Sequence, residues 1–222
     1  MEDKHSHSGL ESSFTDLMTS LAVIFILLLC VSHNQALGIN TPQKVFMELQ
    51  KELKDFSGVE VKRDKNDPLC LLIIVPEGLL QFKTDKADIP PKGDEFLQSF
   101  IPKLALTVDS PKFRNDINSI VVEGYTDSQG ANKPGGIQYN WRLSQERSMA
   151  VVSESLLILE EGHFQGIHVN DFVKMLSASG RGDAKLIIDK KTGRENMAMS
   201  RRVIFKIRVR SIEQRLVKDI TS

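Results

Sequence analysis

An uncharged apolar run near the N-terminus constrains the fold of this chain most. Residues 17–31 read LMTSLAVIFILLLCV and contain no charged side chain. As a helix this run spans about 22 Å at about 1.5 Å per residue, whereas a bilayer core about 30 Å thick needs roughly 20 residues. A membrane-spanning helix must therefore take in polar neighbours. We predict it over residues 14–33, after a tail of residues 1–13.

Asp16 is the acidic residue that this extension brings into the predicted membrane helix. From its position alone, two interpretations stay open. The carboxylate can sit in the first helical turn, where it stabilises the positive end of the helix dipole. Alternatively it faces a protein-lined ion pathway, because an ionisable group at membrane depth is costly and usually serves ion transfer. The hydroxyl groups of Thr15, Thr19 and Ser20 can hydrogen-bond a carboxyl group or a passing ion, although such groups also occur in plain helix packing.

A cleaved signal is a third interpretation of the same segment. Lipoprotein and secretory signals need a basic start and small residues before the cleavage point. Here the first thirteen residues hold one lysine against three acids, and Leu28 and Leu29 precede Cys30. The pattern therefore favours a retained helix, while the flanking charges do not determine its orientation.

Composition excludes several function classes. The 222 residues, 41% of them hydrophobic, suffice for one domain with an appendage. Lys and Arg total 29 against 29 Asp and Glu, so we expect no direct contact with nucleic acid. Cys30 and Cys70 match no metal-ligand spacing. The sequence contains no nucleophile elbow, phosphate-binding loop, dinucleotide fingerprint or zinc motif, so we predict neither an enzyme nor a bound cofactor.

A short amphipathic helix is predicted beyond the membrane segment, in a linker of residues 34–65. Thr41 and Pro42 have the pattern of a helix start, and Gly58 that of a stop. An apolar stripe lies between them, formed by Val45, Leu49, Leu53 and Phe56. The simplest role for this helix is a spacer or a dimer seam, and a plug over an ion path is the alternative.

The remaining chain alternates strands and helices. We predict strands over residues 69–75, 117–123, 184–189 and 203–209, and helices over 92–106 and 143–160. The last strand alternates apolar and basic residues, which predicts burial of one face only. These elements indicate an α+β domain over residues 66–212 with helices packed on one sheet, followed by a tail of residues 213–222.

Two segments carry the candidate recognition site. In VEGYTDSQG, residues 122–130, Thr126 and Asp127 directly follow a predicted strand. In NWRLSQERS, residues 140–148, Asn140 or Ser144 is a natural helix N-cap, with Arg147 in the first turn. An Asp and an Arg at one junction can bind a zwitterion through its ammonium and carboxylate groups. The simpler alternative is a surface ion pair, worth at most about 1 kcal/mol.

The ordered motifs LLQFKTDKADIPPKG, VEGYTDSQG, NWRLSQERSMAVVSESL, SASGRGD and SRRVIFKIRV resemble the OmpA-like peptidoglycan-binding domain. This resemblance implies a βαβαββ-type fold outside the inner membrane, in which Asp127 and Arg147 bind the diaminopimelate of the peptide stem. The further residues that it places at or near the site are Thr126, Asn140, Leu143 and Arg202. Two departures concern ligand affinity: extra residues GANKPGG lie before Asn140, and Ser200 stands where the family usually has Asn.

The segment SFTDLMTSLAVIFILLL resembles the single membrane helix of MotB-type stator subunits. The resemblance implies that Asp16 carries the translocated ion, expected to be a proton, and that the N-terminus is cytoplasmic and the C-terminal domain periplasmic. The start MEDKHSHSGLESSFTDLMTSLAVIFILLLCVSHNQ is most similar to the ZorB family of Zorya anti-phage defence systems. That similarity implies a homodimer in contact with membrane lipids and peptidoglycan, inside a ring of five MotA-like ZorA subunits. A flagellar-type stator and a Pal-like structural tether remain alternatives.

Overall fold

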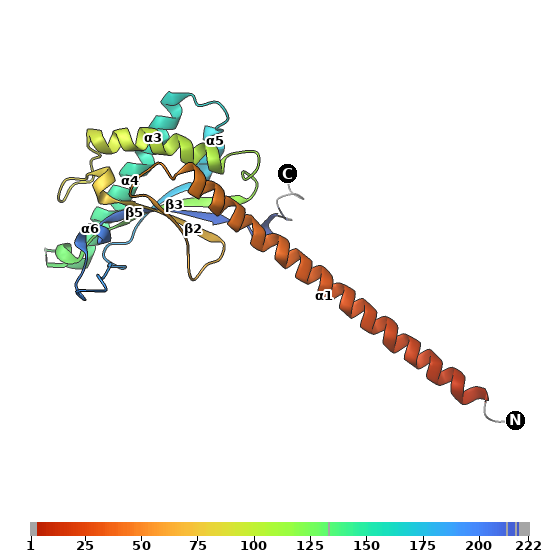
Figure 1. The fold of residues 1–222 in the computed structure, drawn as a ribbon. Helices are drawn as coiled ribbons and strands as arrows, with labels where there is room; N and C mark the ends of the chain where they lie inside the picture. The colour runs from red at the N-terminus through yellow and green to blue at the C-terminus, as the bar shows by residue number, and fades with distance from the viewer. Residues whose placement is uncertain (1–3, 133, 212, 216, 218–222) are drawn as a thin grey trace. The chain divides into compact units, whose positions relative to one another are not determined.

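The computed structural model describes residues 4–132, 134–211, 213–215 and 217, with side chains undescribed at 4–13, 33–40 and 131. The chain divides into two compact units, Met1–Asn40 and Thr41–Ser222. Helix α1 (Lys4–Glu52) contributes residues to both units (Figure 1).

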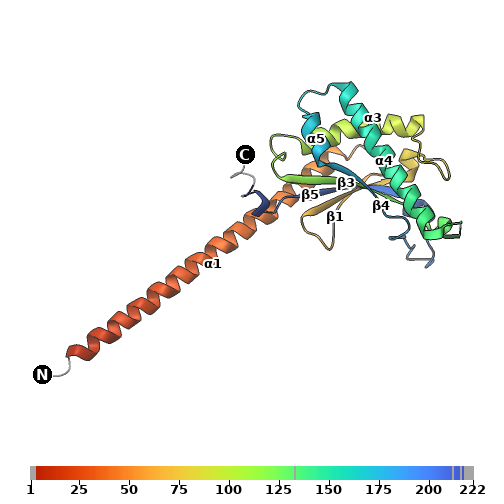
Figure 2. The same cartoon turned by 180° about the vertical axis from the view of Figure 1, so that it is seen from behind.

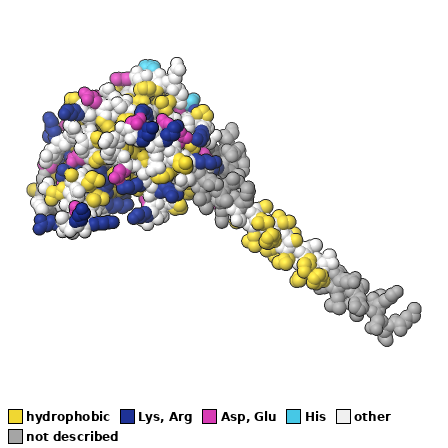
Figure 3. All heavy atoms as spheres, in the orientation of Figure 1, with side chains coloured by type: hydrophobic (Ala, Val, Ile, Leu, Met, Phe, Trp, Pro, Cys, Tyr) yellow, Lys and Arg dark blue, Asp and Glu magenta, His cyan; other side chains and the backbone are white. Residues whose placement is uncertain are grey.

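The first unit contains the apolar helix that the sequence predicts. Residues Phe14–Ser32 form a stretch of 19 residues with a mean hydropathy of 2.4, which is long and apolar enough to cross a membrane. All of their side chains are exposed, and Figure 3 shows them as a band of hydrophobic groups. The backbone is helical from Lys4 onward, so residues 4–13 of the predicted tail are helical, and residues 1–3 lie outside the described part.

The C-terminal end of α1 belongs to the core of the second unit. Val45, Leu49 and Leu53 are at most 2% exposed. This stripe is therefore buried within its own chain and is not free to form the predicted dimer seam. The predicted helix start at Thr41 is also corrected, because Pro42 lies inside α1. Helix α1 continues through Pro42 although proline has no backbone N–H to donate.

The second unit is built on a mixed five-stranded sheet with the order β1-β2-β5-β3-β4. Only the β3–β4 pair is parallel; β1–β2, β2–β5 and β5–β3 are antiparallel. The strands are β1 (Glu60–Arg63), β2 (Cys70–Pro76), β3 (Ile117–Tyr125), β4 (Leu176–Gly180) and β5 (Arg202–Val209). Strands β2, β3 and β5 confirm three of the four predicted strands.

The predicted strand over residues 184–189 is wrong. Residues 184 and 185 lie in a turn, residues 186, 187 and 189 are irregular, and Ile188 makes an isolated bridge to Glu195. The remaining strand of the sheet is instead β4, which pairs with β3 in parallel and whose sequence LSASG has none of the β-branched and aromatic residues that mark strands. The edge strand β1 also lies in the predicted linker, so the folded unit begins before residue 66.

The longer helices cover one face of the sheet (Figure 2). Helix α3 (Pro91–Val108) continues through Pro102, and α4 (Gly136–Gly162) ends at the predicted glycine. The shorter helices are α2 (Glu77–Leu80), the 3-10 helix η1 (Ser128–Asn132), α5 (Val169–Met175) and α6 (Met197–Ser200). The order β2-α3-β3-α4-β4-β5 gives the predicted βαβαββ series, with β1 added at one edge. The α+β fold is thereby confirmed.

The core lies between this helical layer and the sheet. Phe100 of α3 contacts Phe205 of β5, with ring centroids 5.3 Å apart, and also Phe56, at 5.5 Å. Outside the core, charged side chains of both signs are interspersed on the face of this unit seen in Figure 3. Phe56 follows α1, so the segment after the predicted membrane helix is part of the same hydrophobic core.

Replacing Leu49 by Ala tests this packing. Leu49 is fully buried, so we expect Leu49→Ala to lower the free energy of unfolding by about 2–5 kcal/mol. Met47, on the same helix, is 59% exposed, and Met47→Ala should change it by less than about 0.5 kcal/mol. Urea unfolding of the full chain in detergent, followed by tryptophan fluorescence, measures both. Equal stabilities of the two variants would contradict the buried stripe.

Candidate functional site

A pocket of about 230 Å³ lies where the ends of β2 and β3 meet the first half of α4. Polar and charged side chains dominate its lining. The lining residues are Glu77, Phe82, Thr84, Asp85, Thr126, Asp127, Gln129, Gly130, Tyr139, Asn140, Leu143, Arg147 and Arg201. Five of the residues predicted from the sequence are therefore brought together: Thr126, Asp127, Asn140, Leu143 and Arg147.

Helix α4 reaches the pocket in a different way from the prediction. It begins at Gly136, after Gly135 with φ 90°, so Asn140 and Ser144 are interior residues and not N-caps. Only Gly136, the last residue of the GANKPGG segment, lies in this helix, and Gly130 and Asn132 belong to the preceding 3-10 helix over Ser128–Asn132. Arg147 accordingly lies well inside the helix, and its side chain is held by tertiary contacts instead of by the helix terminus.

Asp127 is fixed at the end of β3. Its Oδ1 accepts a hydrogen bond from the backbone N–H of Gln129 at 3.0 Å, and its carbonyl oxygen accepts one from Asn140 Nδ2 at 3.3 Å. Gly130 is required beside this contact, because a Cβ there would lie 1.8 Å from the Asn140 side-chain oxygen. The neighbouring Thr126 is buried, and its hydroxyl has no hydrogen-bond partner among the described residues.

Arg147 is held by one carboxylate, two carbonyl groups and an aromatic ring. Its Nη1 lies 2.9 Å from Glu77 Oε1, while Nε and Nη2 donate to the carbonyl oxygens of Lys86, at 3.0 Å, and Lys83, at 3.3 Å. The guanidinium carbon also lies 4.9 Å from the centroid of the Phe82 ring. Burial lowers the pKa of Arg147, and the charge of Glu77 opposes this effect. The group therefore remains a cation with most of its donors in use.

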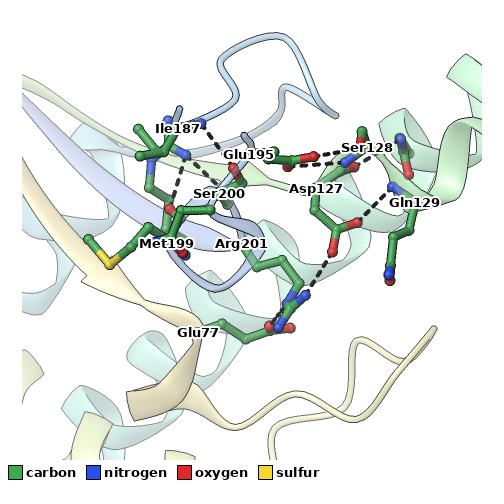
Figure 4. A network of polar contacts seen from close by, with 12 residues as sticks. Glu77, Asp127, Ser128, Gln129, Ile187, Glu195, Met199, Ser200 and Arg201 are labelled. Carbon is green, nitrogen blue, oxygen red and sulfur yellow. Dashed lines mark hydrogen bonds and ion pairs between the residues drawn. The ribbon is translucent and has the colours of Figure 1, made fainter. Parts of the chain in front are cut away.

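Arg201 connects the two halves of the site. Its Nη1 lies 2.7 Å from Asp127 Oδ2, and its Nε pairs with Glu77 Oε2 (Figure 4). Burial acts to lower the pKa of Arg201, but its hydrogen bonds to Asp127 and Glu77 outweigh burial and raise it. The charges thus alternate along a chain of ion pairs, Arg147–Glu77–Arg201–Asp127, which we call the four-charge network. The simpler alternative, a direct surface ion pair between Asp127 and Arg147, is not the arrangement found, because Glu77 and Arg201 connect the two residues.

Arg202, which the sequence placed near the site, does not line this pocket. Its Nη1 donates to the carbonyl oxygens of Met199 and Ser200, and its Nη2 to that of Lys185. The guanidinium lies over the Tyr125 ring, 4.4 Å from the centroid. Its neighbour Arg201 takes the role at the pocket, because successive residues at the start of a strand point in different directions.

Glu77 and Arg201 line the pocket but were not predicted from the sequence. Each lies where a strand of the sheet begins or ends: Glu77 follows β2, and Arg201 precedes β5. The antiparallel pairing of β2 with β5 brings the two together, and the backbone N–H of Glu77 also donates to the carbonyl oxygen of Arg201 at 3.1 Å. A charged residue directly beside an apolar strand was the available signal.

A model of the OmpA family matches residues 81–199, more than half of the chain. The chain belongs to the OmpA family. The matched region contains Thr126, Asp127, Asn140, Leu143 and Arg147, whereas Glu77 and Arg201 flank it. No match was found among curated proteins.

Solved structures share the fold of this OmpA domain. A crystal structure described as that of a MotB-like protein from Desulfovibrio vulgaris is 22% identical, with a TM-score of 0.57, and the match covers 79% of this chain and 99% of that one. The periplasmic domain of Helicobacter pylori MotB (residues 90–256) is 17% identical, with a TM-score of 0.51, over 75% and 89% of the two chains. At these identities the likeness concerns the fold alone.

Ser200 and Glu195, both before β5, have structural roles beside the pocket. Ser200 is fully buried, and its Oγ accepts a hydrogen bond from the backbone N–H of Ile187 at 2.9 Å. Glu195 receives hydrogen bonds from the backbone N–H and the hydroxyl group of Ser128, next to Asp127 (Figure 4). These contacts fasten the segment between β4 and β5 to the rim of the pocket.

The predicted ion-carrying residues lie in the other unit. Asp16, Thr15, Thr19 and Ser20 are all exposed. The Thr19 hydroxyl donates to the backbone carbonyl oxygen of Asp16 at 2.9 Å, not to its carboxylate. Within the described part of the chain, no group of three or more His, Cys, Asp or Glu residues could hold a metal ion.

The Arg147 guanidinium group binds Glu77 and two backbone carbonyl groups through three different nitrogen atoms, a geometry that we call the fork. Arg147→Lys tests its contribution to stability. A lysine keeps the charge opposite Glu77 but cannot also reach both carbonyl groups, so we expect a loss of about 1–3 kcal/mol in the free energy of unfolding. Arg142→Lys is the matched control, because the Arg142 side chain is 71% exposed and pairs only within the helix. Chemical denaturation of both variants gives the comparison. A loss as small as that of the control would mean that the fork is unimportant.

Proposed function

We propose that this chain is the peptidoglycan-anchored, ion-carrying subunit of a MotB-like stator complex. The observation that carries this proposal is the combination of an acidic residue, Asp16, in a helix able to cross a membrane with an OmpA domain whose pocket presents carboxylates and guanidinium groups. The chain is then a single-pass inner-membrane protein with a cytoplasmic N-terminus and a periplasmic OmpA domain.

The pocket supports peptidoglycan as the ligand of the OmpA domain. A carboxylate and guanidinium groups at one site suit a small ligand end that carries both an ammonium and a carboxylate group. The side-chain end of diaminopimelate in the peptide stem is such a group. Its ammonium group would approach Asp127 and its carboxylate the arginines, while Thr126 offers a buried hydroxyl for a further hydrogen bond.

Binding to isolated sacculi tests the cell-wall assignment. Asp127→Ala removes the anionic partner of the ligand, and we expect sacculus binding to weaken by at least about tenfold. Asp55→Ala is a matched acidic control, because the Asp55 side chain is 68% exposed. Co-sedimentation of the full-length protein with purified sacculi provides the measurement. Equal sedimentation of the two variants would refute binding at this pocket.

The membrane helix supports the ion-carrying role of Asp16. A lone helix cannot shield a carboxylate from lipid, and all side chains of the described apolar stretch are exposed. A surrounding protein partner is therefore required. In the proposed complex, two copies of this chain stand inside a ring of five MotA-like ZorA subunits, and the OmpA domain fixes them to the cell wall.

The energetics of such a complex are adequate. One elementary charge crossing about 100 mV releases roughly 2.3 kcal/mol, so several protons can drive the ring between two states. A wall-bound domain provides the fixed point against which the ring turns. The resemblance of the first 35 residues to the ZorB family supports anti-phage defence of the Zorya type as the output.

Phage plating on cells that carry the operon tests the role of Asp16. Asp16→Asn removes the titratable proton at nearly constant size, so we expect protection to be lost while membrane insertion and assembly persist. Asp16→Glu keeps the carboxyl group and is the matched control. Full protection by Asp16→Asn at equal expression would contradict ion transfer. A wild-type operon that restores motility and gives no protection would favour a flagellar-type stator.

A Pal-like structural tether is the second candidate, because the OmpA fold serves with any membrane anchor. It predicts that replacing residues 14–31 by an unrelated apolar helix leaves function intact. The stator proposal predicts loss of function in this exchange, with sacculus binding unchanged.

A further inference from the structure

The four-charge network offers a means of selecting ligands by charge. Its side chains are largely withdrawn from water: Arg147 is 6% exposed, Asp127 9%, Glu77 14% and Arg201 33%. Two guanidinium groups face two carboxylates, so the network as a whole is neutral. Asp85 also lines the pocket but is exposed to solvent, where water and salt screen its charge.

We propose that Glu77 and Arg201 are the specificity-determining residues of this pocket, which they keep neutral so that it selects a ligand end bearing one ammonium and one carboxylate group. This inference rests on the proposed function, since it concerns the same ligand. Neither residue lies in the region matched to the OmpA family.

The neutrality of the four-charge network determines which ligand ends the pocket favours. A zwitterionic end adds no net charge, and each of its charges finds an opposite partner among the four side chains. An end that carries only an ammonium or only a carboxylate group leaves one charge uncompensated in a partly buried site, which is costly. The pocket therefore discriminates against both singly charged forms. This electrostatic cost adds to the loss of the direct contacts that the missing charged group would have made.

Arg201 is central because both carboxylates share it. Its Nη1 pairs with Asp127 and its Nε with Glu77, and it is the most exposed member of the network. Arg147, in contrast, already donates to Glu77 and to two backbone carbonyl groups. The ligand carboxylate therefore reaches Arg201 more readily, and Arg147 positions Glu77.

The test compares three synthetic stem tripeptides, L-Ala-γ-D-Glu-meso-diaminopimelate and two derivatives. One derivative carries an amide in place of the side-chain carboxyl group, and the other an acetyl group on the side-chain amine. Their dissociation constants with the full-length protein in detergent are measured by calorimetry. We expect the wild type to prefer the unmodified peptide over each derivative by about tenfold or more.

The variants should change the preference in opposite directions. Glu77→Gln leaves the network with a net positive charge, so its discrimination against the acetylated peptide should fall by about tenfold. Arg201→Gln leaves a net negative charge, so discrimination against the amidated peptide should fall similarly. Arg201→Lys keeps the charge and should retain the wild-type order. The double variant with Glu77→Gln and Arg201→Gln is neutral again and should recover the order, even if all affinities are weaker.

The outcomes separate this inference from the proposed function. If the single variants weaken binding of all three peptides by the same factor, Glu77 and Arg201 only support the structure and the inference is overturned. A failure of the double variant to recover the order would also overturn it. If the wild type binds no tripeptide and no sacculi, the proposed function fails together with the inference. Thermal unfolding of each variant checks that the domain is folded.

Discussion

The pairing of Glu77 with two arginines organises the functional end of the OmpA domain. Through Arg147 it ties α2 and the loop at residues 83–86 to the middle of α4, and through Arg201 it reaches the start of β5 and the end of β3. Four segments far apart in the sequence thus meet at one carboxylate. Removing this group would leave two partly buried guanidinium groups without their main partner, which is costly. The geometry of the pocket therefore depends on a residue that also defines its charge.

The sequence predicted those features that depend on local pattern. The apolar run of α1 is visible from composition alone. The alternation in β5 follows from burial of one face of the sheet, and the helical spacing in α3 follows from burial of one stripe of the helix. The pocket residues in α4 and after β3 were identified through resemblance to a family, and the structure brings five of them together. Arg202 was predicted to lie near the site, and its neighbour Arg201 lines the pocket, because neighbouring arginines cannot be distinguished without the direction of the strand.

What the sequence did not predict depends on tertiary pairing. Strand β4 is polar and rich in small residues, and it becomes a strand because β3 lies beside it and α4 packs across it. Strand β1 has four residues at a sheet edge, too few to show a period. The Glu77–Arg201 pair joins residues 124 positions apart in the sequence, and a local pattern cannot predict which distant residue a charged side chain will pair with. The domain was predicted to begin at residue 66, whereas the folded unit begins at Thr41. The residues against which Val45 and Leu49 pack are distant in the sequence, so the local pattern did not assign this segment to the domain.

The packing of residues 41–53 also gives the domain a mechanical property. Thr41 is the first residue of the second unit, and its hydroxyl accepts a hydrogen bond from Arg215, which in turn pairs with Asp116. A force that unravels the domain from Thr41 must first break these contacts of Arg215. It must then remove the buried side chains of Val45, Leu49 and Leu53 from the hydrophobic core. Residues 41–53 therefore hold the entry point of the domain by the same hydrophobic core that supports the sheet.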